Sequence, residues 1–253
     1  MTDKRSVKIV ATIEARMTSS RLPGKVLLPV LGQPLLHHLV GRLKAVPSID
    51  EIVLATTVKA TDDVLEVFAK DEGIGCFRGS ETDVMARVIG AAESANADVV
   101  VEITGDCPII DPQLVEQTIR MFMAHDVAYA SNSIIKSYPD GMETQVFRLE
   151  TLRRSAAMTS DPLDHEHVTL HICNHTELFS RVHLVAPPEL HWSGLGLTLD
   201  EPADYELLRK IIEHFGKANP LFSCLDVIRL LREHPDWLSI NNAVQRKIPQ
   251  RAG

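Results

Sequence analysis

The first half of the chain alternates between short apolar segments and amphipathic ones. Short apolar runs, the longer ones rich in Val, Ile and Thr, predict strands over residues 7–15, 51–57, 74–77, 98–104 and 127–131. Apolar residues at helical spacing predict helices between these strands, over residues 35–45, 61–72, 80–94 and 112–125. Short apolar strands separated by helices are typical of βαβ units, which build a mostly parallel sheet covered by helices on both faces. The chain is therefore predicted to form a three-layer α/β fold.

The second half of the chain is less regular. It predicts strands over residues 145–148 and 181–185, and helices over residues 150–158, 166–174, 203–215 and 223–232. No linker, repeat or low-complexity segment divides the 253 residues, a length that suits one large domain or two small ones. We therefore interpret residues 1–253 as a single domain with an irregular region around residues 132–197.

Charge and hydropathy exclude several classes of partner. The chain carries 34 acidic and 26 basic residues, a formal net charge of −8, whereas a general nucleic-acid binder presents a basic face. It has no apolar run of the roughly 18 residues that would predict a membrane helix. Its four cysteines form no CxxC pair, and free thiols suit a reducing compartment. The sequence predicts a soluble, cytoplasmic protein that binds neither nucleic acid nor membrane.

A cationic loop follows the first predicted strand, at the end of the sheet where open α/β folds bind ligands. Residues 14–25 read EARMTSSRLPGK and include Arg16, Arg21 and Lys25, three hydroxyl side chains and one glycine. Hydroxyls and backbone amides donate to phosphate oxygens, and Arg and Lys neutralise their charge. The loop matches neither the Walker A nor the GxGxxG pattern. A polar surface turn is the simpler alternative, but three cations in an acidic chain favour a polyphosphate site.

Two aspartates follow predicted strands in the same way. Asp106 ends the buried segment in ITGDCP, and Asp200 lies between a short apolar strand and a helix in TLDEP. Each alone fits a helix N-cap, which is the better interpretation of Asp200 taken by itself. Beside a cationic loop, however, two carboxylates from different strands predict a Mg²⁺ site that bridges the phosphates of a nucleotide.

Two further segments carry polar groups that suit a ligand. The turn YPDGME places Tyr138, Asp140 and Glu143 together, although an ordinary loop is the simpler interpretation. His167 is followed by two histidines at intervals of four residues on a predicted helix, a spacing that permits zinc. Position 169 is Thr, so the HExxH pattern is absent, and we favour helix-face or substrate-pocket histidines.

Taken together, these segments resemble the cytidylyltransferases that make CMP-activated sugar acids, above all the branch named for spore coat polysaccharide biosynthesis protein F. The resemblance covers most of the chain in order, through residues 15–25, 77–81, 103–108, 138–141, 166–169 and 198–202. It implies a Rossmann-like, three-layer αβα nucleotidyltransferase fold with a mostly parallel sheet. It also implies a Mg²⁺-dependent reaction of cell-surface glycan biosynthesis, in which an acceptor oxygen attacks the α-phosphorus of CTP and pyrophosphate leaves. Related synthetases are often dimers, so the resemblance suggests a homodimer.

The same resemblance assigns roles to individual residues. CTP would be bound by Ala15, Arg16, Ser19, Arg21, Lys25, Arg78, Ser80 and Gly105. Mg²⁺ would be held by Asp106 and Asp200. The acceptor, a sugar acid, sugar phosphate or phosphonate, would face Tyr138, Asp140, Glu143 and His167. Arg16, Lys25 and Asp106 would be the catalytic residues, because phosphoryl-type transfer depends on positioning and charge neutralisation.

Four positions depart from the family pattern. The family usually has Gly at the position of Thr18, where a Cβ restricts the approach of the backbone to phosphate. It commonly has Arg at Gly196, Pro at Leu170 and an acidic residue at Gln145. The last three changes lie on the acceptor side, so the sequence does not predict which acceptor the protein uses.

Two other functions fit part of the pattern. A metal-dependent glycosyltransferase that uses a nucleotide-sugar has a similar sheet but usually holds its metal through Asp-x-Asp, and position 108 is Pro. A non-catalytic nucleotide-binding relative would keep the pocket and lose turnover, and Thr18 and Gly196 are the features that support it.

Overall fold

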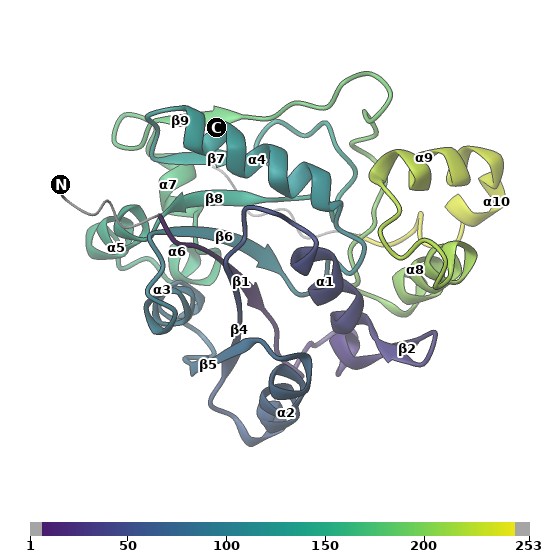
Figure 1. Ribbon diagram of the computed structural model, residues 1–253, viewed down its shortest axis with the longest axis horizontal. Helices are drawn as coiled ribbons and strands as arrows, with labels where there is room; N and C mark the ends of the chain where they lie inside the picture. Colours follow the sequence, from purple (N-terminus) through teal and green to yellow (C-terminus); the bar gives the residue numbers. More distant parts are fainter. Residues whose placement is uncertain (1–6, 246–253) are drawn as a thin grey trace.

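The computed structural model describes residues 7–245 and has a seven-stranded sheet at its centre (Figure 1). Its strand order is β5-β4-β1-β6-β8-β7-β9. The parallel part consists of β5 (Gly75–Gly79), β4 (Glu51–Thr57), β1 (Ile9–Glu14) and β6 (Val99–Thr104). Beyond it, β8 (Gln145–Arg148) is antiparallel to both β6 and β7 (Tyr129–Ser131), and β9 (Arg181–His183) is parallel to β7. The predicted mostly parallel sheet is confirmed.

Helices cover both faces of this sheet (Figure 1). One hydrophobic core joins the sheet to α1 (Leu35–Lys44), α2 (Asp63–Glu72) and α4 (Pro112–Ala124). A second core joins the opposite face to α3 (Val84–Ser94), α5 (Leu149–Met158) and α7 (Leu170–Asn174). Along β1, Val10 packs into the second core and Ala11 into the first. Such strands are apolar on both faces, which is why they stand out in the sequence.

A third core lies beside the sheet and is built by C-terminal helices. It contains apolar residues of α8 (Pro202–Phe215) and α9 (Cys224–Glu233), followed by α10 (Pro235–Leu238). The short strands β2 (Pro29–Val30) and β3 (Gln33–Pro34) form a separate hairpin before α1. Short 3₁₀ helices cover Lys25–Leu27 and Ala60–Asp62. No helix within residues 7–245 is long and apolar enough to cross a membrane.

Arg42 connects the C-terminal core to the sheet. Its side chain is buried on α1, and its Nη1 atom donates to the backbone oxygens of Ile110 at 3.2 Å and Phe222 at 2.9 Å. The guanidinium also lies 4.0 Å from the centre of the Phe222 ring. Burial lowers the pKa of Arg42 to about 10. These contacts fix the segment that follows Asp106 against the C-terminal helices.

The predicted helix over residues 166–174 is wrong. The structure has two short helices instead, α6 (Pro162–Glu166) and α7, and the chain turns between them. Val168 adopts a left-handed φ of 47° and is buried in the second core, where its packing offsets the strain of that conformation. His167 therefore does not share a continuous helix face with His171 and His175, and the spacing argument for zinc does not apply.

Two smaller predictions near the site also need correction. The helix predicted to start at Ser80 begins at Val84, with Asp83 as its N-cap accepting from the backbone N–H of Ala86 at 2.8 Å. The segment before Asp200 is not a strand of the sheet. It is joined to the end of β6 by one backbone bond instead, in which the N–H of Leu199 donates to the oxygen of Asp106 at 2.8 Å. That bond brings the two aspartates together.

Candidate active site

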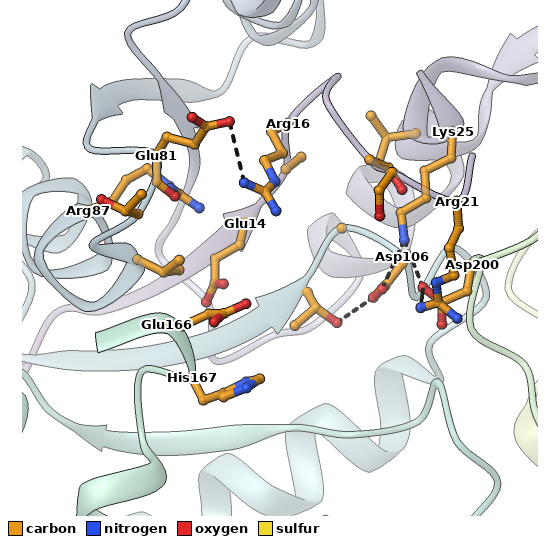
Figure 2. A pocket seen from close by; sticks show the side chains of 18 of the residues that line it. Glu14, Arg16, Arg21, Lys25, Glu81, Arg87, Asp106, Glu166, His167 and Asp200 are labelled. Carbon is orange, nitrogen blue, oxygen red and sulfur yellow. Dashed lines mark hydrogen bonds and ion pairs between the residues drawn. The ribbon is translucent and has the colours of Figure 1, made fainter. Parts of the chain in front are cut away.

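A cavity of about 580 Å³ opens at the carboxyl ends of β1 and β6, where the topology predicts a ligand site. Residues of the loop after β1 line one side of it, and residues of α6 line another (Figure 2). It contains these predicted site residues: Ala15, Arg16, Ser19, Arg21, Lys25, Gly105, Asp106, His167 and Asp200. The sequence-predicted cations and carboxylates thus converge on one space.

The loop after β1 is held in shape by its own backbone and by a buried aspartate. The N–H of Gly24 donates to the oxygen of Met17 at 2.9 Å, and Gly24 adopts a left-handed φ of 71°. The N–H of Met17 donates to Asp62 Oδ1 at 2.8 Å, and Asp62 also accepts from Thr57 at the end of β4. Met17 follows Arg16 and Gly24 precedes Lys25 in the chain. Because both are held by these hydrogen bonds, Arg16 and Lys25 extend into the cavity from fixed backbone positions.

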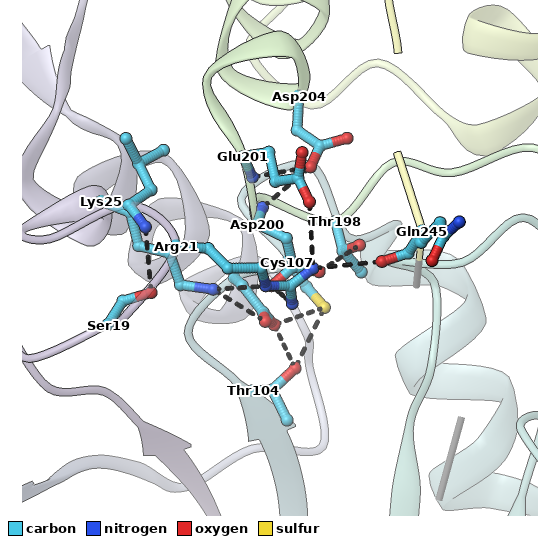
Figure 3. Close-up of polar contacts among 12 residues, drawn as sticks. Ser19, Arg21, Lys25, Thr104, Cys107, Thr198, Asp200, Glu201, Asp204 and Gln245 are labelled. Carbon is cyan, nitrogen blue, oxygen red and sulfur yellow. Dashed lines mark hydrogen bonds and ion pairs between the residues drawn. The ribbon is translucent and has the colours of Figure 1, made fainter. Parts of the chain in front are cut away.

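Lys25 forms the centre of the polar cluster at one end of the cavity (Figure 3). Its Nζ atom lies 3.2 Å from Asp106 Oδ2 and 3.0 Å from Asp200 Oδ1. Arg21 Nη2 also contacts Asp200 Oδ1, at 2.8 Å. Asp106 accepts a second bond from Thr104 Oγ1 at 2.6 Å. Burial would lower the pKa of Lys25, but the two carboxylates outweigh it and raise the pKa.

The N-cap interpretation of Asp200 is wrong in this structure. Helix α8 is capped by Glu201, which forms a reciprocal capping box with Asp204. Asp204 Oδ2 accepts from the backbone N–H groups of Asp200 and Glu201, at 3.1 and 2.9 Å. The Asp200 carboxylate is therefore available to the cavity, where it contacts Lys25 and Arg21.

Arg16 and Arg87 mark the other end of the cavity (Figure 2). Arg16 Nη1 lies 3.5 Å from Glu81 Oε1, and Lys59 Nζ lies 2.5 Å from Glu81 Oε2. Arg87 is buried on α3 and its Nη1 atom donates to the backbone oxygen of Ser80 at 2.5 Å. At this end Glu81 pairs with Arg16 and Lys59, and the carboxylates of Glu14, Asp62 and Glu81 all act on the charge of Arg87.

Buried carboxyl groups lie in the floor between these two ends. Glu14 lines the cavity, and Glu102 lies behind it on the neighbouring strand, where the register pairs Thr12 with Glu102. Burial raises the pKa of Glu102 well above its usual range, and the charge of Glu14 raises it further. A hydrogen bond joins Glu102 to Glu14 and, together with burial, favours the protonated form of Glu102. The amide of Gln145 donates to Glu102, and its oxygen accepts from Tyr129 Oη at 2.6 Å.

The substitution Glu102→Gln should stabilise the protein at alkaline pH. The pKa of Glu102 is raised in the folded state above the value of about 4.3 in the unfolded chain, so stability falls as the pH rises above that value. The neutral amide would remove this penalty, and we expect a gain of about 2–4 °C in Tm at pH 8, equivalent to about 1 kcal/mol in a domain of this size. The gain should shrink at pH 5, as measured by thermal unfolding.

Glu116 provides a control of opposite sign. Burial would raise its pKa, but hydrogen bonds from Arg120 and Ser48 outweigh that and lower it. Glu116→Gln should therefore cost stability at pH 8 rather than add it. Equal Tm changes in Glu102→Gln at pH 5 and pH 8 would contradict the raised pKa of Glu102.

Five predicted site residues lie outside the lining of the cavity. Arg78 pairs with Asp63 at 2.6 Å and Glu66 at 3.0 Å on α2, and Ser80 Oγ accepts from the N–H of Asp83 at 3.0 Å. On the acceptor side, Lys136 Nζ contacts Asp140 at 2.7 Å and Glu143 at 3.1 Å. Tyr138 packs in the third core, and burial raises its pKa to about 12. These side chains have protein partners, so their contacts with ligand stay predictions.

The cavity also contains functional groups that sequence reasoning missed. These are Glu14, Glu81, Arg87 and Glu166. Arg87 had a detectable signal, because it is a charged residue among the buried Met85, Val88 and Ala91 of a predicted helix. Glu14 adjoins the cationic loop directly, and Glu166 precedes His167.

The sequence is similar to known proteins over most of its length. A family model described as Cytidylyltransferase matches residues 10–221. The chain is 35% identical over 233 residues to the spore coat polysaccharide biosynthesis protein SpsF of Bacillus subtilis strain 168, a match that covers 90% of this chain and 95% of that protein.

Solved structures agree with the sequence matches. A cytidylyltransferase from Leptospira borgpetersenii serovar Hardjo-bovis superposes with a TM-score of 0.87 at 31% identity, over 96% of this chain and 100% of that one. A CMP:2-keto-3-deoxy-manno-octonic acid synthetase complexed with CTP has a TM-score of 0.60 at 20% identity, over 82% of this chain and 99% of that one. The more distant structure shares the fold, and the other matches extend over nearly the whole chain.

Proposed function

Because this chain belongs to the cytidylyltransferase family, we propose that it transfers CMP from CTP to a small acidic, sugar-like acceptor and releases pyrophosphate. It is a nucleotidyltransferase enzyme. One observation carries the proposal. The cavity brings three cations of the loop after β1 together with the carboxylates of Asp106 and Asp200. That combination suits a triphosphate and a divalent cation.

Asp106 and Asp200 have the donor chemistry and the placement to hold Mg²⁺. One oxygen of each lies within 3.2 Å of the same Lys25 nitrogen, so a single cation already contacts both. Mg²⁺ in phosphate-transfer sites is typically held by one or two carboxylates together with substrate phosphates. When bound, the ion would neutralise phosphate charge and polarise the α-phosphorus toward attack.

The chain's own cations would stabilise the leaving group. The acceptor oxygen would form a bond to the α-phosphorus while the bond between the α-phosphorus and the α–β bridging oxygen breaks. Negative charge then collects on the departing pyrophosphate. Arg16, Arg21 and Lys25 approach the cavity from one loop, and fixed cations are most valuable where charge develops in the transition state.

The acceptor is proposed to enter from the side of α6. Glu166 and His167 line the cavity there, across from the loop after β1 (Figure 2). The synthetase with a similar fold is named for a keto-deoxy sugar acid, and the relative in B. subtilis for polysaccharide biosynthesis. A sugar acid, sugar phosphate or phosphonate used in cell-surface glycan biosynthesis fits these names, and Arg16, Arg21 and Lys25 supply cations that could pair with such an acidic acceptor.

The two alternative functions receive less support. A glycosyltransferase of this type would pair Asp106 with residue 108, whereas the carboxylate next to Asp106 is Asp200 from a distant segment. The case for a non-catalytic relative rested partly on Thr18. Thr18 is not among the non-glycine residues with positive φ, so its Cβ causes no strain, and its Oγ1 donates to Glu81 at 3.2 Å.

Ligand-dependent thermal stability tests the proposal directly. A ligand at about 100 times its Kd adds roughly 2.7 kcal/mol, which corresponds to a rise in Tm of about 5–10 °C for a domain of this size. We expect that rise with CTP plus Mg²⁺ and a much smaller one with ATP, GTP or UTP. Acceptors would then be screened by pyrophosphate release.

The outcomes separate the parts of the proposal. A larger shift with another nucleotide would replace CTP as the substrate and keep the chemistry. No shift with any nucleotide would contradict a nucleotide site in this cavity. The homodimer and the cytoplasmic location stay predictions, which light scattering and cell fractionation test separately.

A further inference from the structure

Two cations of the cavity, Lys25 and Arg21, are paired with its carboxylates. Lys25 Nζ lies 3.2 Å from Asp106 Oδ2 and 3.0 Å from Asp200 Oδ1. Arg21 contacts Asp200 at 2.8 Å and Glu201 at 3.7 Å. The side chains of Lys25 and Asp200 are only 13% and 15% exposed, so solvent screens their contact weakly. The carboxylates are therefore balanced in charge by the protein's own residues (Figure 3).

This pairing conflicts with the roles that the reaction requires. The proposed function assigns Lys25 to the triphosphate and assigns Asp106 and Asp200 to a divalent cation. An ammonium within 3.2 Å of both carboxylates occupies the space between them. A Mg²⁺ ion held by Asp106 and Asp200 would need carboxylate oxygens that the ammonium group of Lys25 already contacts. The two cations therefore exclude one another.

The carboxylate pair also lacks further protein ligands. Within residues 7–245, no group of three or more His, Cys, Asp or Glu side chains is placed to hold a metal ion. Mg²⁺ keeps several oxygen ligands and dehydrates reluctantly. Two carboxylates that already bind an ammonium therefore form a weak metal site until phosphate oxygens complete it.

We propose that Lys25 is an internal counter-ion that blocks the metal site until a nucleoside triphosphate draws its ammonium group away. The exchange would conserve charge pairs, because Lys25 passes from carboxylate to phosphate while the metal ion takes its place between Asp106 and Asp200. If the triphosphate binds alone, it draws the ammonium group of Lys25 away from the two carboxylates. If the metal ion binds alone, it displaces that ammonium group, which then has no phosphate to pair with. Metal and triphosphate are thus expected to bind with positive coupling, each raising the affinity for the other by the same factor.

The structure permits this exchange without refolding. Lys25 carries a flexible four-carbon stem and lies at the start of a short 3₁₀ helix after Gly24. The surrounding carboxylates keep other donors when it leaves, since Asp106 accepts from Thr104 at 2.6 Å and Asp200 contacts Arg21. The side chain can therefore change partners while the backbone of the loop stays in place.

The first experiment measures Mn²⁺ binding to the full-length protein without nucleotide, by the loss of the free-ion electron paramagnetic resonance signal. Lys25→Met should bind Mn²⁺ at least about tenfold more tightly than wild type, the effect of about 1.4 kcal/mol of relieved competition. Lys59→Met is the matched control. It removes one positive charge beside Glu81 at the other end of the cavity, 2.5 Å from that carboxylate, and leaves Asp106 and Asp200 untouched.

Two further variants test where the additional Mn²⁺ binds and whether the Lys25 substitution disturbs the fold. Adding Asp106→Asn to Lys25→Met should abolish the gained affinity, which assigns it to the carboxylate pair. Lys25→Gln, which lacks the charge but keeps polar character, replaces Lys25→Met if circular dichroism shows that Met disturbs the fold. Equal Mn²⁺ affinities in Lys25→Met and Lys59→Met would overturn the proposal.

The second experiment measures coupling and separates this inference from the proposed function, on which it rests for the identity of the nucleotide. Inorganic tripolyphosphate and CTP are titrated into wild type and Lys25→Met, with and without Mn²⁺. Wild type should show coupling of at least about tenfold, or about 1.4 kcal/mol, and the variant much less. Coupling with tripolyphosphate but no binding of CTP would refute the cytidylyltransferase function and support the exchange. Binding of CTP with no coupling to Mn²⁺ would support the CTP site and refute the exchange.

Discussion

Asp106→Asn is expected to lower the rate of pyrophosphate release on the order of 10³-fold while the protein stays folded. Asp106 directs one carboxylate into the cavity, and a neutral amide is a far poorer ligand for a hard divalent cation. The amide keeps the size of the side chain, and its oxygen can still accept from Thr104. The rate would be measured at saturating CTP, Mg²⁺ and acceptor, so that weaker binding does not imitate a chemical defect.

Asp71→Asn controls for the removal of one negative charge. Asp71 is exposed on α2 and does not line the cavity, so this variant should turn over at the wild-type rate. Thermal unfolding of both variants checks that any lost activity is not lost structure. Wild-type turnover by Asp106→Asn would remove Asp106 from the metal site and with it the mechanism proposed above.

The central strands were predictable because of where they lie. Residues 51–57 were predicted as a strand and form β4 with the same bounds. This strand is covered on both faces, so it reads as a continuous apolar run bounded by polar residues. Strand ends also fix where loops meet, which is why the loop after β1 and Asp106 after β6 were correctly expected to lie together.

The break at Val168 was not predictable from local sequence. The spacing of apolar residues over 166–174 fits a helix, and neither Gly nor Pro interrupts it. The turn is imposed by distant contacts. Thr169 is buried and its Oγ1 donates to Gln145 at 2.5 Å on β8, while Val168 packs in the core beneath α3 and α5. Tertiary packing here outweighs helical propensity.

The polar floor of the cavity was missed for a related reason. Glu102 lies within a strand that otherwise reads as apolar, and only the sheet register brings it behind Glu14. Similarly, the family resemblance assigned Arg78 to CTP because of its motif, but the direction of its side chain depends on Asp63 and Glu66 of α2. The motifs indicate which segments of the chain lie near the cavity. Sheet register and ion pairs with distant residues determine which of their side chains line it.

Gly105→Ala should have the second largest effect, because the strand ends that carry the site meet at this glycine. The N–H of Gly105 donates to the oxygen of Glu14 at 2.8 Å. A Cβ at Gly105 would lie 2.7 Å from that oxygen and 3.0 Å from the Cβ of Ala15. β1 and β6 would have to separate, which moves Asp106 away from the cationic loop. We expect about a 100-fold loss of kcat/KM for CTP, since misplacement by about 1 Å costs that much, and destabilisation by about 1–3 kcal/mol.

Gly41→Ala is the matched control, because the same methyl group has room there. Gly41 lies on the exposed side of α1, and a Cβ at that position would have no neighbour within 4 Å. Alanine also favours a helix over glycine by about 1 kcal/mol, so this variant should be active and slightly more stable. Normal kcat/KM in Gly105→Ala would mean that the strand ends can separate without moving the reacting groups. The cavity geometry would then not be what positions Asp106 against the triphosphate.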